Sequence, residues 1–148
     1  MNPAFLIIAL ATIVAAACSQ DNSPTSSTPA PLNVPFSSVD LRAGTGADAT
    51  NGRTLTVNYT GWLYSTSAAN NKGTQFDSSL NPERTPFSFV LGTGNVIQGW
   101  HQGIVGMKVG GLRRLVLPPN LAYGVQGSPP TIPGNATLIF EVELLGVQ

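Results

Sequence analysis

Strict two-residue alternation of apolar and polar side chains, once near residue 55 and once near the carboxyl end, constrains the fold most. The apolar positions are Leu55, Val57 and Tyr59 in residues 54–60, and Leu138, Phe140, Val142 and Leu144 in residues 137–145. A period of two predicts β-strands with one buried face and one solvated face. In the second segment the alternation assigns Ile139, Glu141 and Glu143 to the solvated face.

Residues 95–105 carry the one clear helical pattern. Their apolar positions recur at helical spacing, at Val96, Ile97, Trp100, Ile104 and Val105. Asn95 is the expected N-cap, because its short side chain can accept a hydrogen bond from the first helical turn. Spacing alone favours a Trp100 that fills the core. A Trp100 that forms the floor of a pocket is the alternative.

Shorter segments complete an α+β pattern of several antiparallel strands and one helix. Residues 75–79, 87–91 and 112–117 read as further strands, residues 118–123 as a short helical turn, and residues 124–135 as a long Gly/Pro loop. Arg113 and Arg114 are expected on a solvated sheet edge rather than in a binding site.

The amino terminus is typical of an exported protein. Ala4–Ala17 is an apolar run of the length found in signal peptides, and the chain's one cysteine, Cys18, follows directly. We expect a signal peptide over 1–17 and lipidation of Cys18. Ordinary secretion with cleavage nearby and an uncleaved anchor are the alternatives. Residues 18–34, rich in Ser, Pro and Thr, read as a flexible tether, which leaves 35–148 as the domain.

Composition excludes several classes of function. The chain of 148 residues has 9% charged residues, with seven basic and seven acidic side chains, so nucleic-acid binding is not expected. One His and one Cys cannot build a zinc site, and no phosphate-binding loop, dinucleotide fingerprint or nucleophile elbow is present. His101 reads as a surface residue of the helix. We expect no metal and no cofactor.

Aromatic side chains remain as the candidate functional groups. They lie on or beside the predicted apolar faces at Tyr59, Phe76, Phe87, Trp100, Tyr123 and Phe140. Asp77 follows Phe76 and is the candidate for a buried carboxylate. For any one of these aromatic residues, a role in the core is the simpler interpretation.

From about Gly52 to Leu145 the chain resembles FK506-binding-protein (FKBP)-type peptidyl-prolyl cis-trans isomerases, and the extra residues in loop 64–73 are typical of the bacterial lipoprotein members. The matching segments are VNYTGWL (57–63), GTQFDSS (73–79), PFSFVLGTGNVIQGW (86–100), GMKVGG (106–111), LAYG (121–124) and IPGNATLIFEVELL (132–145). The resemblance implies a curled antiparallel sheet of about five strands around one short α-helix.

The resemblance also implies roles for individual residues. It assigns the pocket floor to Trp100, and the pocket carboxylate to Asp77. The Ile97 backbone N–H and the Tyr123 hydroxyl would donate to ligand carbonyls, Val96 would border the pocket, and Ile132 would lie on an overhanging loop. The pocket walls would be Tyr59, Phe76, Phe87 and Phe140. Residues 80–85 depart from the family pattern, so no role is carried onto Arg84.

The implied activity is X-Pro isomerisation in exported proteins, without a covalent step. Its partners would be proline-containing polypeptides and macrolides of the FK506 or rapamycin type. The chain would be a monomer, held through Cys18 on the periplasmic side of a bacterial membrane, with the outer membrane favoured. A membrane-tethered proline-binding or chaperone module with little turnover is the main alternative, and a purely structural lipoprotein is another.

Overall fold

The structure is a computed structural model that describes residues 32–148. The predicted signal peptide 1–17, Cys18 and nearly all of the predicted tether 18–34 lie outside the described residues. The elements are β1 (Ser37–Arg42), β2 (Thr54–Tyr64), η1 (Ala69–Asn71), β3 (Lys72–Ser78), β4 (Phe87–Val90), α1 (Gln98–Ile104), β5 (Leu112–Leu117), η2 (Pro119–Leu121) and β6 (Leu138–Val147). Among the described residues no helix is long and apolar enough to cross a membrane.

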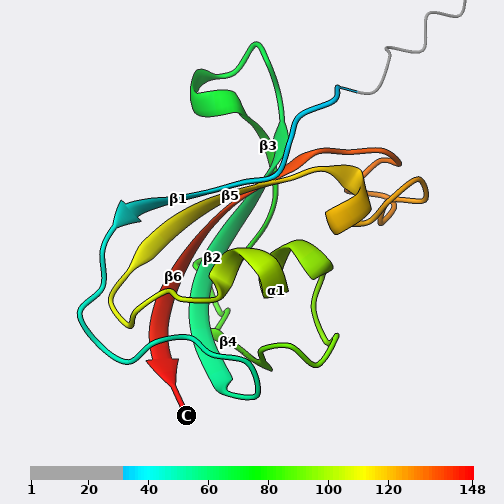
Figure 1. Cartoon of the computed structure of the whole chain (residues 1–148). Helices are drawn as coiled ribbons and strands as arrows, with labels where there is room; N and C mark the ends of the chain where they lie inside the picture. Colours follow the sequence, from blue (N-terminus) through cyan, green and yellow to red (C-terminus); the bar gives the residue numbers. More distant parts are fainter. Residues whose placement is uncertain (1–31) are drawn as a thin grey trace, which may run out of the picture. The chain divides into compact units, whose positions relative to one another are not determined.

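Six antiparallel strands form one sheet, and α1 lies across one of its faces (Figure 1). The strand order is β1-β5-β6-β2-β3, and β4 also pairs with β2. The long β2 therefore has β6 along one edge, and along the other it pairs with β4 through Thr54–Val57 and with β3 through Thr60–Tyr64. The predicted α+β class is confirmed, with six strands rather than about five.

The additional strand, β1, is the element that sequence patterning missed. Its pattern Ser-Ser-Val-Asp-Leu-Arg is almost wholly exposed, because β1 forms an edge of the sheet, so its sequence carries little apolar signal. Because β1 pairs with β5, the prediction that Arg113 and Arg114 lie on a solvated edge is wrong. Arg113 bonds to Asp40 and to two backbone carbonyls at the carboxyl end of α1, and Arg114 bonds to Glu141.

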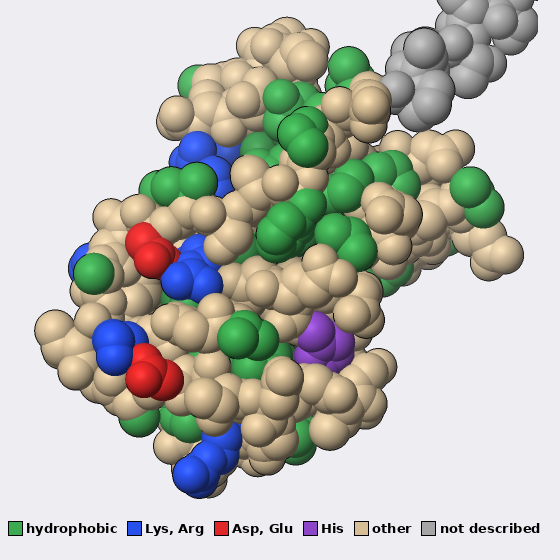
Figure 2. Space-filling view, viewed as in Figure 1, with side chains coloured by type: hydrophobic (Ala, Val, Ile, Leu, Met, Phe, Trp, Pro, Cys, Tyr) green, Lys and Arg blue, Asp and Glu red, His purple; other side chains and the backbone are tan. Residues whose placement is uncertain are grey.

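Charged side chains of the described residues are arranged in pairs of opposite sign. Figure 2 shows this on one face, where blue and red side chains adjoin within a mostly uncharged surface. Within residues 32–148, every Lys, Arg, Asp and Glu except Arg53 and Glu83 takes part in a salt bridge. The surface therefore has little extended field of either sign.

The helix α1 is shorter than the sequence pattern predicted. Ile97, with an extended backbone (φ −57°, ψ 147°), is the N-cap residue, and no side chain caps the helix. The predicted Asn95 cap is therefore wrong, because the turn between β4 and α1 continues to Ile97. The helix ends at Ile104, so Val105 leaves the apolar face and is 44% exposed.

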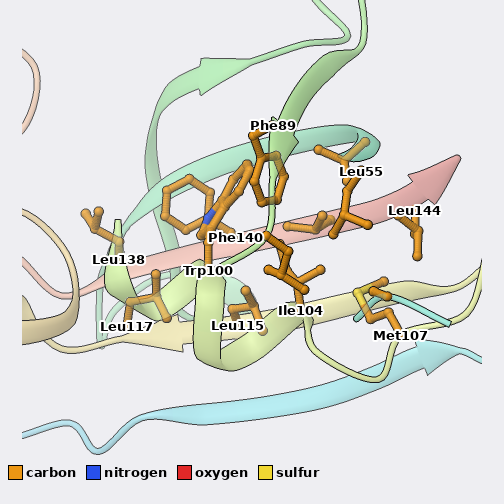
Figure 3. Close-up of a cluster of buried hydrophobic side chains, with 14 of the residues drawn as sticks. Leu55, Phe89, Trp100, Ile104, Met107, Leu115, Leu117, Leu138, Phe140 and Leu144 are labelled. Atoms are coloured by element: carbon orange, nitrogen blue, oxygen red, sulfur yellow. The ribbon is translucent and has the colours of Figure 1, made fainter. Parts of the chain in front are cut away.

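One hydrophobic core lies between α1 and the sheet (Figure 3). Leu55, Leu115, Leu138 and Leu144 project into it from the sheet, and Ile104 packs onto them from the helix. The predicted inward face of residues 138–144 is confirmed. On the opposite face, the predicted exposure of Ile139 is wrong, because it lies in register between Trp62 and Val116 and is 1% exposed.

Candidate functional site

A cavity of about 440 Å³ opens beside the start of α1. It collects side chains from β2, β3, β4, α1, β6 and the segment after η2, which lie far apart in the sequence. The lining residues are Tyr59, Phe76, Asp77, Phe87, Gly94, Asn95, Val96, Ile97, Trp100, Tyr123 and Phe140. Nine of the ten residues predicted for catalysis and substrate binding are among them.

Trp100 lies between the cavity and the hydrophobic core and is 4% exposed. Figure 3 shows its ring near those of Phe89 and Phe140, with Leu115 and Leu117 on the other side. The ring centroids lie 5.5 Å from Phe89 and 5.4 Å from Phe140. Trp100 therefore belongs both to the hydrophobic core and to the lining of the cavity.

The cavity walls are aromatic rings in edge-to-face contact. Tyr59 lies 5.2 Å from Trp100 and 6.2 Å from Phe87, and Phe76 lies 5.5 Å from Phe140, as ring-centroid distances. Gly61 makes this packing possible, since a Cβ there would lie 2.5 Å from the Phe76 ring and 2.8 Å from the Phe140 ring. Edge-to-face pairs are a preferred packing geometry for aromatic rings and contribute about 0.5–1.5 kcal/mol each beyond the area that they bury.

One polar cluster lies at the edge of this aromatic surface. The Tyr59 hydroxyl donates to Oδ2 of Asp77 at 2.5 Å, and Nη2 of Arg84 approaches Oδ1 of Asp77 at 3.4 Å. Burial, and then the bond to Asp77, raise the pKa of Tyr59 to about 12. The predicted burial of Asp77 is wrong, since its side chain is 37% exposed. Arg84, to which the sequence argument gave no role, belongs to this cluster.

The rim of the cavity carries the two predicted hydrogen-bond donors. Tyr123 follows η2 and is 39% exposed, and burial together with the Asp77 charge raises its pKa, so the hydroxyl keeps its proton at neutral pH. Ile97 is the N-cap residue of α1, so its backbone N–H is one that the helix itself does not use. Both groups border the apolar space.

Two sequence predictions fall outside the lining. Ile132 is 4% exposed and packs in the hydrophobic core rather than on the cavity surface. The predicted surface position of His101 is wrong, because the residue is 8% exposed and its two ring nitrogens face backbone N–H groups of the loop before α1. Gly94 and Asn95 also line the cavity, although the sequence pattern did not predict this. The sequence feature that could have indicated it is their position in a Gly-rich turn directly before the helix.

The arrangement suits binding of a small apolar ring with carbonyl groups beside it. Within residues 32–148, no group of three or more His, Cys, Asp or Glu side chains is placed to hold a metal ion. The groups offered to a ligand are aromatic faces, one carboxylate that accepts from Tyr59, and donors at the rim. Such a site can bind and orient a peptide segment without forming a bond to it.

Comparison with known proteins finds relatives that all belong to one family. A family model described as FKBP-type peptidyl-prolyl cis-trans isomerase matches residues 46–145. An FK506-binding protein of Neisseria meningitidis serogroup A is 50% identical over 108 residues, which cover 73% of this chain and 92% of that protein. The human peptidyl-prolyl cis-trans isomerase FKBP2 is 54% identical over 97 residues, which cover 66% of this chain and 63% of that protein.

These matches agree with the fold and with the aromatic cavity. The family model covers residues 46–145, a range that contains every residue that lines the cavity. The chain belongs to the FKBP-type peptidyl-prolyl cis-trans isomerase family.

Proposed function

We propose that the aromatic cavity is the place where the chain isomerises X-Pro bonds, with the proline ring seated over Trp100. The observation that carries this proposal is the set of four aromatic rings, most of them in edge-to-face contact, that lines one open cavity: Tyr59, Phe87, Trp100 and Phe140. A proline ring is small and apolar, and it matches such a surface better than a longer charged side chain would.

The chemistry requires no nucleophile. Rotation about a peptide bond crosses a barrier of roughly 18–20 kcal/mol, because the twisted amide loses its resonance. An apolar cavity disfavours the charge-separated planar amide more than the twisted one. Each 1.4 kcal/mol or so of such preference for the transition state gives about a tenfold higher rate. Donation from the Ile97 N–H and the Tyr123 hydroxyl would hold the carbonyls of the rotating segment.

The substrates would be proline-containing polypeptides, and FK506-like macrolides would compete for the same cavity. The relatives' printed names support the second half of this proposal, since several are called FK506-binding proteins. The test is catalysis of proline-limited refolding of a model protein, with and without FK506. Acceleration that the drug blocks would support both the activity and its place. A folded chain that binds proline peptides but gives no acceleration would favour the proline-binding module instead.

We further propose that the chain acts on exported proteins while anchored in a bacterial membrane through a lipidated Cys18. The support is the apolar run Ala4–Ala17, the cysteine that follows it, and the Ser/Pro/Thr-rich segment up to residue 34. The test is detergent phase partitioning of the chain made in an exporting bacterial host. The wild-type chain should enter the detergent phase and Cys18→Ser should remain in the aqueous phase. Equal partitioning of both would contradict lipidation.

A further inference from the structure

His101 is a buried imidazole that contacts the loop forming one side of the cavity. It follows Trp100 in α1, and it is 8% exposed. The backbone N–H of Gly92 lies 2.8 Å from its Nδ1, and the backbone N–H of Gly94 lies 3.2 Å from its Nε2. Both ring nitrogens therefore face hydrogen-bond donors.

The protonation state of the ring decides how many of these bonds exist. A neutral imidazole has one nitrogen that accepts and one that carries a proton, so it satisfies one of the two N–H groups at a time. The shorter contact favours Nδ1 as the acceptor. An imidazolium has two N–H groups and no acceptor, so both contacts would become donor against donor.

The loop held by these bonds carries part of the cavity. Gly92 and Gly94 have φ of +88° and +79°, a region in which glycine alone is comfortable. Two to three residues later the same loop supplies Val96 and Ile97 to the lining. Because His101 and Trp100 are adjacent in α1, the imidazole fixes the loop relative to the cavity floor.

The cavity beside the ring contains no carboxylate that could pair with a positive charge. This second cavity, of about 410 Å³, lies beside His101 and is lined by Asn51, Gln98, Gln102, Val105 and the loop glycines, none of which is ionisable. From β4, the uncharged Phe89 lies 6.5 Å from the imidazole as a ring-centroid distance. This cavity also gives protons and water a route to the ring.

We propose that His101 is a positioning residue of the isomerase: its neutral imidazole holds the loop 92–97 against α1, and protonation of the ring releases that loop and lowers turnover. The inference rests on the proposed cavity, because Ile97 is the donor whose position the loop sets. It makes the activity of this chain depend on the protonation state of this one ring.

The test compares the full chain with three variants in kcat and KM for an uncharged X-Pro peptide between pH 8 and pH 5. His101→Glu supplies a carboxylate that accepts both N–H groups. His101→Leu removes every acceptor. Gln102→Leu is the matched control, because it alters the second cavity from the same helix without touching the loop bonds.

We expect kcat/KM of the wild-type chain and of Gln102→Leu to fall about tenfold on acidification, the cost of roughly one lost hydrogen bond. In His101→Glu, kcat/KM should keep its pH 8 value down to pH 5. In His101→Leu, kcat/KM should be low at both pH 8 and pH 5. A wild-type profile as flat as that of His101→Glu, or a His101→Leu variant with the wild-type profile, would overturn the proposal.

A spectroscopic readout separates this proposal from the identity of the cavity. In amide NMR spectra the Gly92 and Gly94 signals should shift with pH in the wild-type chain and stay fixed in His101→Glu. This result would stand even if the chain showed no isomerase activity at pH 8, which would count against the cavity alone. If His101→Leu does not fold, this NMR comparison of the wild-type chain with His101→Glu still tests the proposal. Glycine signals that move equally in both chains would overturn the role of His101.

Discussion

The Tyr59 hydroxyl donates to the Asp77 carboxylate at 2.5 Å, while the ring of the same tyrosine packs at 5.2 Å against Trp100. Tyr59 thus joins the polar edge of the cavity to its floor. A bond from a phenol to a carboxylate is charge-assisted and short, and it holds the ring in one orientation. We infer that Asp77 contributes to activity by keeping the aromatic wall in place.

A double-mutant cycle over Tyr59 and Asp77 tests this coupling. Asp77→Ala should lower kcat/KM by about three- to tenfold, because the Tyr59 hydroxyl loses its acceptor at a partly exposed site. Tyr59→Phe should lower kcat/KM by a similar factor. The double variant should lose no more kcat/KM than the more impaired single variant, which corresponds to a coupling free energy of about 1 kcal/mol. Losses that multiply independently would show that the hydrogen bond does not connect the two residues in function.

Gly61 provides a test of the cavity walls that substitutes none of the residues lining the cavity. Gly61→Ala should destabilise the fold by roughly 1–3 kcal/mol and lower activity, because its Cβ would push the Phe76 and Phe140 rings apart. Gly146→Ala is the matched control, since a Cβ at this β6 position meets nothing within 4 Å. Urea unfolding and the peptide assay measure both effects. Equal stability and activity of the two variants would contradict the described wall.

Alkaline stability should depend on Tyr59. Its pKa is about 12 in the folded chain and that of the reference tyrosine is 10.0, so the native state holds this proton more tightly than the unfolded state. The resulting stabilisation is complete below pH 10 and is lost as pH rises from 10 to 12. Tyr59→Phe should therefore show a shallower fall in urea midpoint between pH 9 and 11. An unchanged slope would contradict the assignment.

Turnover should be almost independent of ionic strength. The charges of the described residues are mostly paired with neighbours of opposite sign, so no extended field steers a charged substrate (Figure 2). We expect kcat/KM for acidic, neutral and basic X-Pro peptides to change less than twofold between about 0.02 and 0.5 M salt. A strong salt dependence for one sign of peptide would reveal a charged surface that these residues do not provide.

Sequence patterning predicted the elements whose apolar residues repeat. The strand 112–117 has the predicted bounds, and β6 has its predicted inward face. Periodicity could not predict that the aromatic residues share one cavity, because their side chains come from five elements that meet only in the folded chain. The order of the family motifs did predict it. Family resemblance therefore supplied most of the cavity.

The errors have a common physical origin, which is tertiary pairing that local pattern does not contain. Strand β1 is exposed and polar, yet its pairing places Arg113 and Arg114 inside the sheet. The helix pattern suggested a surface position for His101, but the turn before α1 folds back and covers the ring. Ile139 is buried by its neighbours on adjacent strands, at a position where alternation alone predicts solvent.

The chain's two tryptophans allow the most direct test of the central claim, because Trp100 lines the cavity and Trp62 does not. Trp62 lies on β2, and the Lys72 ammonium lies 4.3 Å from the centroid of the Trp62 ring. The measurement is catalysis of proline-limited refolding by the wild-type chain, Trp100→Leu and Trp62→Phe, each first shown to be folded by circular dichroism. We predict that Trp62→Phe retains the wild-type acceleration and that Trp100→Leu loses at least tenfold. Equal acceleration by folded Trp100→Leu would contradict the placement of isomerisation in this cavity.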